Sequence, residues 1–395
     1  MQSQAKRSST VQNGFHFSSV LLISFAHLLH DIFSSFLAPI LPLLIRKLGL
    51  TYTQAGLLST VQRLPSILNP LLGILAEKVK VRYFLVAGPL ITVTSMSLLG
   101  TAPYYSVLLV LLFVMGFGTA IFHVPAPAMV RHVAGNRIGK GMSYYMLGGE
   151  MARTLGPLTI LGAVSLWGLE GTYRLIPFGF VASAILYLKF RTVSIQEDFR
   201  KDKPQSTIHH TLKRFTPFFI VIGGYVFFRA VMKSALTLYL PTYLSIKGAN
   251  LWIAGISLSV LQLSGAAGTF IAGTLSDRIG RKRTLLICGI AAPLSMWCFT
   301  LFQNVLMFPI LILLGFFIVA SGPVILAMVQ DTDSEYPAFM NSIFMTINFG
   351  ISSIMGLLLG AVSDQIGLEL TYKICAWVGF ASIPFILFLK QPKRA

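Results

Sequence analysis

The chain has 395 residues, of which 55% are hydrophobic and 11% are charged, and its mean hydropathy is +0.75. Soluble domains devote roughly a quarter of their residues to charged types. This sequence therefore has too few charges for a water-facing surface, which excludes a soluble enzyme, and lipid is expected to cover most of it. The net charge of +18 would suit nucleic-acid binding, but the basic residues gather in short loops, where membrane topology accounts for them.

Apolar windows of about 20 residues, long enough for a helix to cross a bilayer, recur along the whole chain. The first one follows Lys6 and Arg7, is too long for a signal peptide and lacks a small-residue cleavage site, so it is interpreted as a membrane span. The predicted spans are 17–41, 54–76, 82–101, 105–130, 141–165, 171–189, 216–243, 251–275, 284–302, 305–329, 338–361 and 370–389.

Lys and Arg residues distinguish the two sides of the membrane. Most of them lie in the N-terminal segment, in the loops 78–82, 131–140 and 278–283, in the central polar stretch and in the C-terminal tail. The loops of the opposite side hold only Arg46, Lys47, Arg174, Lys247 and Lys373. We therefore expect a multi-pass protein of a bacterial inner membrane with both termini in the cytoplasm, which requires an even number of spans.

The two halves of the chain repeat each other. Gln62, Gly73, Glu77 and Lys78 recur in the second half as Gln262, Gly273, Asp277 and Arg278, and Pro42 and Pro241 are predicted to close the first and seventh spans. The predicted fold is an all-α integral membrane protein with twelve transmembrane helices in two pseudo-symmetric six-helix lobes. The expected lobes are residues 1–190 and 216–395, joined by a cytoplasmic linker over 191–215.

The loop between the eighth and ninth spans carries the strongest motif, Gly273-Thr-Leu-Ser-Asp277-Arg278-Ile-Gly280-Arg281, followed by Lys282 and Arg283. Gly273 would let two helices approach closely, and Asp277 could accept hydrogen bonds from helix ends or an Arg. The motif resembles the loop signature of the major facilitator superfamily, with a degraded copy at Gly73 and Glu77. The resemblance implies a gate on the cytoplasmic side; the alternative is a basic loop that only sets topology.

The fifth predicted span carries a second motif, Gly148-Gly149 followed by Gly156-Pro157. It resembles the antiporter signature of drug-exporting major facilitators, in which glycines permit close packing and a bend where the lobes pivot. A generic glycine-packed helix is the alternative.

Two regions also resemble the fosmidomycin resistance protein family. They are His27-Leu-Leu-His30-Asp31 in the first span, and the stretch with Phe122-His123, Arg131, Gly148-Gly149 and Leu155-Gly156-Pro157-Leu158. The resemblance implies a proton-driven exporter of a bacterial inner membrane. This chain departs from the family in having Val124-Pro125 in place of Pro-Glu, and Glu150 and Arg153 in place of Asn and Ser, so fosmidomycin does not carry over as the substrate.

Ionisable groups inside a membrane are costly, so they normally face a wet cavity or a partner. Asp31 lies in mid-span with His30 beside it and His27 on the same helical face. A carboxylate beside imidazole could exchange a proton near neutral pH, or could form a structural hydrogen bond between helices. Glu150 and Arg153 are spaced to pair; either they only neutralise each other, or Glu150 titrates and frees Arg153 for substrate. The proposed proton-coupling residues are Asp31, Glu150, His27 and His30.

Basic groups outnumber acids within the spans. Arg229 and Lys233 share one helical face, so either they face an anionic ligand or Lys233 pairs with an acid elsewhere. Such an excess favours an anionic or phosphonate-like substrate. The candidate substrate-binding residues are Arg153, Arg229, Lys233, Arg63 and His123. An acidic loop (Asp331, Asp333 and Glu335) is either solvated or pairs with the basic 278–283 loop in one gating state.

The sequence thus predicts a secondary transporter working by alternating access, of drug/proton antiporter type, which exports a small anionic or amphipathic compound. A proton-coupled importer of an organic anion is the alternative, and a receptor or scaffold without flux is an alternative of another class. No nucleotide loop, catalytic triad or metal spacing is present, and Cys288, Cys298 and Cys375 show no CxxC pattern. We therefore expect no enzyme activity, cofactor, metal or disulfide, and a monomer whose partners are the substrate, protons and lipid.

Overall fold

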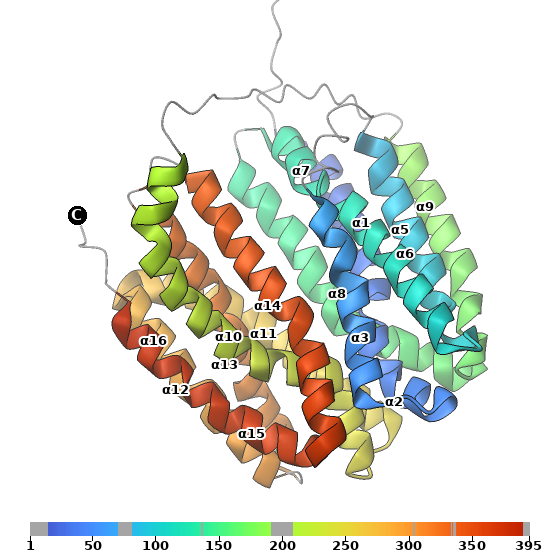
Figure 1. Ribbon diagram of the computed structural model, residues 1–395. Coiled ribbons are helices and arrows are strands. Elements are labelled where there is room, and N and C mark those ends of the chain that lie inside the picture. The colour runs from blue at the N-terminus through green and yellow to red at the C-terminus, as the bar shows by residue number, and fades with distance from the viewer. Residues whose placement is uncertain are drawn as a thin grey trace, which may run out of the picture.

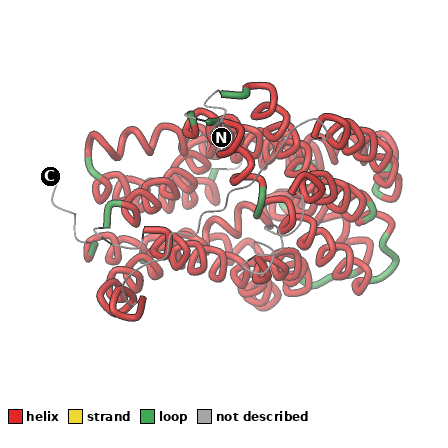
Figure 2. The backbone as a smooth tube through the Cα atoms, turned by 90° about the horizontal axis from the view of Figure 1, so that it is seen from above, coloured by secondary structure: helices red, strands yellow, loops and turns green. Residues whose placement is uncertain are grey.

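The computed structural model describes residues 15–69, 81–135, 137–190, 208–302, 305–332, 334 and 337–389. All regular structure in these residues is helical, and the described connections are short (Figures 1 and 2). The first half contains α1 (Phe17–Ser34), α2 (Leu37–Leu48), α3 (Tyr52–Arg63), α5 (Val81–Ser97), α6 (Tyr105–His123), α7 (Ala126–Ala134), α8 (Ile138–Trp167) and α9 (Ile176–Phe190). The second half contains α10 (Ile208–Ile246), α11 (Leu251–Ile279), α12 (Arg281–Leu301), α13 (Met307–Gln330), α14 (Pro337–Ile366), α15 (Leu368–Phe380) and α16 (Ser382–Phe388).

Ten helical stretches of the described residues are long and apolar enough to cross a membrane. Two of the predicted spans are not among them. The span predicted over 54–76 lies partly outside the described residues, and the span predicted over 141–165 corresponds to α8, a 30-residue helix that carries Glu150 and Arg153. The chain is therefore a multi-pass membrane protein, and its helices are consistent with the twelve-helix fold.

The first span is interrupted where the sequence suggested continuity. Helix α1 ends at Ser34 and α2 begins at Leu37. The Ser35 hydroxyl contacts the main-chain oxygens of Asp31 (2.9 Å) and Ile32 (2.8 Å), which places a side chain in competition with the helical hydrogen bonds. This break lies one turn beyond Asp31.

Proline positions correct the predicted helix ends. Pro42 lies inside α2 and Pro241 inside α10, so the prediction that these prolines close their helices is wrong. Proline is tolerated within membrane helices where neighbouring helices satisfy the freed backbone groups. The fourth predicted span is instead divided after His123, since Pro125 has no N–H for the helical ladder and α7 starts at Ala126. Residues 208–215 of the predicted linker already belong to α10.

The two halves of the chain lie side by side in Figure 1 and pack together chiefly through α3 with α14, α8 with α11, and α2 with α10. One apolar cluster continues across this boundary, from Ile40 and Leu41 in the first half to Tyr239 in the second. The Tyr239 hydroxyl donates to the carbonyl oxygens of Tyr52 (2.9 Å) and Gly356 (3.0 Å). These contacts lie toward the end of the bundle opposite the starts of α1 and α10.

Helices α3 and α14 approach each other through facing glycines. A Cβ atom built on Gly56 would lie 2.2 Å from the Gly356 carbonyl oxygen, and one built on Gly360 would lie 2.2 Å from the Tyr52 carbonyl oxygen. No side chain fits at either point. The close approach of the two halves therefore depends on these glycines.

We expect the Gly56→Ala variant to weaken the contact between α3 and α14, because the added methyl group cannot be accommodated without separating them. Overpacking of this kind costs about 1–3 kcal/mol. Thermal unfolding of the purified protein should show a lower midpoint, and spin labels on the two helices should report longer distances. Gly162→Ala is the control, since a Cβ there meets no described atom within 4 Å. Equal effects of the two substitutions would contradict this account of the interface.

Candidate functional site

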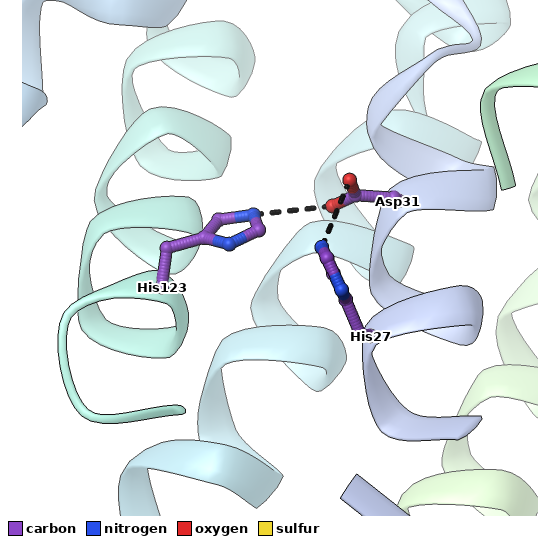
Figure 3. Close-up of side chains that lie close together, drawn as sticks. All are labelled: His27, Asp31 and His123. Atoms are coloured by element: carbon purple, nitrogen blue, oxygen red, sulfur yellow. Dashed lines mark hydrogen bonds and ion pairs between the residues drawn. The ribbon is translucent and has the colours of Figure 1, made fainter. Parts of the chain in front are cut away.

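Asp31 lies at the centre of a buried polar cluster in the first half (Figure 3). Its Oδ1 atom is 2.8 Å from His30 Nδ1 and 3.1 Å from His123 Nε2, and its Oδ2 atom is 3.3 Å from His27 Nε2. Asp31 is only 5% exposed, and His27 and His30 are also buried. The spacing of His27 and Asp31 on one helical face is thus realised as a direct contact.

The outer ring nitrogens of these histidines contact residues of two further helices, α5 and α8. His30 Nε2 lies 3.0 Å from the Thr92 hydroxyl on α5. His123 Nδ1 on α6 lies 3.3 Å from the Tyr145 hydroxyl on α8, and His27 Nδ1 lies 2.8 Å from the Tyr145 main-chain oxygen. The His27 and Tyr145 rings are stacked with centroids 4.0 Å apart. The cluster therefore joins α1, α5, α6 and α8.

His123 belongs to this cluster. The sequence predicts His123 as a substrate-binding candidate, and the structure places its ring against the Asp31 carboxylate. Thr92 and Tyr145 were missed altogether, because a threonine and a tyrosine inside apolar spans carry no distinguishing signal in the sequence.

The cluster is compact enough to be considered for a metal ion. Ligand atoms of His27, Asp31 and His123 all lie within 4.8 Å of one another. An ionised carboxylate can only accept, so a hydrogen bond between His123 Nε2 and Asp31 Oδ1 places a hydrogen on this nitrogen and leaves it no lone pair for a metal. The absence of a bound metal stays a prediction.

Glu150 and Arg153 form the ion pair that their spacing predicted. Arg153 Nη1 donates to Glu150 Oε1 at 2.6 Å, with the carboxylate 11% exposed and the guanidinium side chain 44% exposed. An exposed charge in the middle of a membrane helix must meet water or a partner rather than lipid. Arg153 also lies within electrostatic range of Asp31. Helix α8 therefore contributes both this ion pair and the Tyr145 contacts to the surroundings of Asp31.

The basic residues of the two halves approach one another. Lys233 on α10 lies within electrostatic range of Arg63, Arg153, Arg229 and Glu150. Its ammonium group forms no hydrogen bond or ion pair with the described residues, so the predicted pairing of Lys233 with an acid is not found there. The charges of both halves therefore converge on one region.

Arg229 has a different environment from its neighbour one turn away. It is buried, and its Nε donates to the main-chain oxygen of Ile318 on α13 at 3.0 Å. A guanidinium held in this way ties α10 to α13. The structure thus gives Arg229 a partner in the protein and leaves Lys233 as the more available cation of the pair.

The glycine motif of α8 packs against α1 in the same half. Cβ atoms built on Gly148, Gly149 and Gly156 would collide with the Ser24 carbonyl, the His27 ring and the Ser35 hydroxyl, respectively. Pro157 continues the helix. The glycine stripe therefore seats the helix that carries Asp31, and the contact with the other half is made further along α8, where Leu161 meets Gly255 of α11.

The loop motif of the second half is described from Gly273 onward, whereas Gly73 and Glu77 lie outside the described residues. A Cβ at Gly273 would meet no described atom within 4 Å, so the close packing expected there is not found. Gly280 has φ +97°, a conformation that favours glycine, and it separates α11 from α12. Arg278 is the basic residue in the last turn of α11.

Arg281 links this motif to the end of α13. It forms ion pairs with Asp277 and with Asp331 at the end of α13, the latter at 3.1 Å. The expected pairing of the acidic loop with the basic loop is thus confirmed for Asp331; Asp333 and Glu335 lie outside the described residues. The three cysteines are free, as expected.

Asp364 makes a contact that the sequence did not predict. Its carboxylate, near the end of α14, accepts hydrogen bonds from the backbone N–H groups of Tyr52 (2.6 Å) and Thr53 (2.8 Å) at the start of α3. The Thr53 hydroxyl donates to it as well. A carboxylate at a helix N-terminus is favoured by the free N–H groups and the helix dipole. One half of the chain therefore caps a helix of the other.

Comparison with known proteins agrees with this architecture. The sequence model of the Major Facilitator Superfamily matches residues 23–356. The chain is 28% identical to the fosmidomycin resistance protein of Escherichia coli (strain K12), over 94% of this chain and 92% of that protein. It is 29% identical to the uncharacterized MFS-type transporter YfnC of Bacillus subtilis (strain 168), over 95% of this chain and 93% of that protein.

Solved structures share the fold at lower sequence identity. The nucleoside transporter NupG superimposes with a TM-score of 0.72 at 17% identity, over 94% of this chain and 99% of that chain. A D-xylose–proton symporter superimposes with a TM-score of 0.74 at 14% identity, over 95% of this chain and 98% of that chain. At this identity the likeness shows the fold alone.

We expect Asp364→Ala to loosen the end of the bundle where α14 meets α3, because the N–H groups of Tyr52 and Thr53 lose their acceptor. Since the carboxylate is accessible to solvent, the loss should be about 1 kcal/mol. Distances between spin labels on α3 and α14 should broaden toward longer values. Glu369→Ala is the matched control, because Glu369 pairs only with Lys247 and Lys373 of its own half in the described residues. An unchanged distance distribution in Asp364→Ala would contradict the capping role.

Proposed function

We propose that this chain, which belongs to the major facilitator superfamily, is a proton-coupled secondary transporter that exports a small anionic or amphipathic compound by alternating access. The observation that carries the proposal is the buried Asp31 carboxylate with three imidazole rings around it. Such a group is too costly inside a membrane to serve packing alone. Carboxylate and imidazole together are the side chains best suited to take up and release a proton near neutral pH.

The substrate class follows from the converging cations. Arg63 and Arg153 come from the first half and Lys233 from the second, and their charges reach one another. A substrate with an anionic group could bind between the halves and contact cations on both sides, which is the arrangement that alternating access requires. Arg229 supports Lys233 from the same helical face but is held by α13.

The orientation rests on the distribution of Lys and Arg. With both termini in the cytoplasm, the contacts of α3 with α14 and of α8 with α11 lie at the periplasmic end. We therefore propose that the structure is closed toward the periplasm, with Asp364 as part of that closure. The Asp277–Arg281–Asp331 network would then belong to the cytoplasmic gate of the second half.

Export is favoured by two resemblances. The glycine motif of α8 resembles that of drug antiporters, and the E. coli relative is a fosmidomycin resistance protein. We propose that this chain removes its compound from the cell, with a proton entering down its gradient as the source of energy.

Import is the second candidate, and the Glu150–Arg153 ion pair favours it. A proton on Glu150 would release Arg153 to bind an anion, so the proton and the anion would bind together. Binding together leads to symport, whereas export in exchange for protons requires that the two ligands exclude each other. The direction of pH-gradient-driven flux in everted and right-side-out vesicles separates these two functions.

We expect the Asp31→Asn and Glu150→Gln variants to lose transport driven by a pH gradient, because neither side chain can then carry a proton. The measurement is flux in proteoliposomes, with fosmidomycin and a panel of anionic metabolites as probes. Glu170→Gln is the control, since that exposed carboxylate pairs with Lys47 at 2.7 Å away from the cluster. If both variants transported at the rate of the unchanged protein, proton coupling through these residues would be disproved.

Lys233→Gln should weaken binding of an anionic probe roughly ten- to a hundredfold, the loss expected when one charge-assisted hydrogen bond of about 1.5–3 kcal/mol is removed. Ligand-induced thermal stabilisation of the purified protein measures this effect. Arg46→Gln, at an exposed position at the end of α2, is the charge-matched control. An anionic probe that stabilises Lys233→Gln and Arg46→Gln equally well would exclude Lys233 from the substrate site.

A further inference from the structure

The two ring nitrogens of His27 have different surroundings. Nδ1 lies 2.8 Å from the Tyr145 main-chain oxygen, and a carbonyl oxygen can only accept, so Nδ1 carries a hydrogen. In a neutral ring Nε2 then has no hydrogen. This Nε2 atom is buried, has no hydrogen-bond partner among the described atoms, and lies 3.3 Å from Asp31 Oδ2.

The rest of the cluster is satisfied without any extra proton. Asp31 Oδ1 accepts from His30 Nδ1 and His123 Nε2. The other nitrogens of these two rings then accept from the hydroxyls of Thr92 and Tyr145. Both rings are thus neutral and fully paired, and the contact between His27 and Asp31 is the one place where two acceptors face each other.

Two facing acceptors in a buried site are unfavourable, and one hydrogen between them removes the conflict. We infer that this structure holds one exchangeable proton between His27 Nε2 and Asp31 Oδ2, and that the Tyr145 carbonyl of α8 keeps it there by fixing the hydrogen of His27 on Nδ1. The proton can lie on either atom. On Nε2 it makes His27 an imidazolium that donates to the Asp31 carboxylate, and on Oδ2 it makes Asp31 a carboxyl group that donates to neutral His27.

The charges around the proton come from four helices. On α1 and α6, His30 and His123 donate to Asp31 as neutral rings, and α5 contributes only the neutral Thr92 hydroxyl. On α8, the Tyr145 hydroxyl is held by His123, and the positive charge of Arg153 acts on Asp31 from further along the helix while Glu150 partly neutralises it. With the proton the His27–Asp31 pair is neutral, and without it the pair carries one buried negative charge.

The position of α8 decides whether the proton is needed. If α8 moves away from α1, the Tyr145 carbonyl leaves Nδ1, and His27 can carry its single hydrogen on Nε2 instead. Neutral His27 then donates to the ionised Asp31, and the extra proton is released. Gly149 makes the docked arrangement possible, since a Cβ at this position would lie 2.5 Å from the His27 ring carbon Cε1.

This switch rests on the proposed function for its role in transport. Arg153 lies on the same helix as the Tyr145 carbonyl, so a substrate that draws α8 toward the second half would expel the proton from the first. Substrate and proton would then exclude each other, as export in exchange for protons requires. Electrostatics alone would make an anion and a proton bind together, so the exclusion must come from the movement of α8.

Nitrogen NMR of the full-length protein labelled at its seven histidines tests the inference, because it distinguishes the protonated and bare states of each ring nitrogen. We expect His27 Nδ1 to keep its hydrogen from mildly acidic to mildly alkaline pH, while the Nε2 signal changes as the site loses its proton. In Asp31→Asn the side-chain amide can donate to Nε2, and this change should disappear. A bare Nδ1 and a protonated Nε2 in the unchanged protein would overturn the inference.

Two further variants separate the Tyr145 carbonyl from its hydroxyl. Tyr145→Phe keeps the carbonyl, so the His27 signals should stay as they are while those of His123 change. Gly149→Ala displaces the His27 ring and should move its hydrogen to Nε2, whereas Gly162→Ala should not. If Gly149→Ala leaves the folded protein with an unchanged His27 spectrum, the control by α8 is disproved.

The spectra are repeated with a chelator, and a His27 signal that depends on a metal ion would overturn the proton assignment. The outcome is independent of the proposed function. If His27 has the other tautomer but flux remains proton-driven through Glu150, the inference fails and the proposed function stands. If His27 has the expected tautomer but Asp31→Asn transports normally, the inference stands and proton coupling through Asp31 is disproved.

Discussion

A carboxylate inside a membrane protein has to be surrounded by donors, and this constraint organises the first half of the chain. Asp31 receives hydrogen bonds from His30 and His123 and faces His27. The outer ring nitrogens contact Thr92 and Tyr145, so four helices meet around one carboxylate. A substitution in any of these helices that moves a ring therefore alters the environment of the carboxylate.

The contacts between the halves obey a different rule. They consist of glycines that allow backbones to touch, such as Gly56 against Gly356, and of polar groups that cap or cross at one end, such as Asp364 on the start of α3. In a membrane, an apolar side chain gains little free energy by exchanging contact with lipid for contact with another helix. Close packing and hydrogen bonds must therefore hold the halves together. Contacts of this kind are specific because they depend on individual glycines and on individual polar groups.

Helix α8 connects these two regions. Its glycines lie against α1, and Tyr145 contacts two of the histidines. Glu150 and Arg153 form an ion pair in which only the guanidinium side chain is exposed, and Leu161 reaches the second half. A displacement of this one helix would affect the histidines around Asp31, the Glu150–Arg153 pair and the contact between the halves at once. The glycine motif therefore has its physical explanation in the seating of α8 on the helix that carries Asp31.

The amino-acid sequence by itself determined the class of protein and much of the local geometry. Lack of charge requires lipid, apolar windows mark the helices, and the helical repeat places His27 beside Asp31 and Glu150 beside Arg153. The tertiary structure decided the rest. It brought His123 to Asp31 and Tyr145 to two of the histidines, tied Arg229 to a main-chain oxygen of α13, and showed Pro42 and Pro241 inside helices. The physical reason is that contacts within a helix follow from spacing along the chain, whereas contacts between helices depend on which faces pack together, and uniformly apolar faces do not encode their partners.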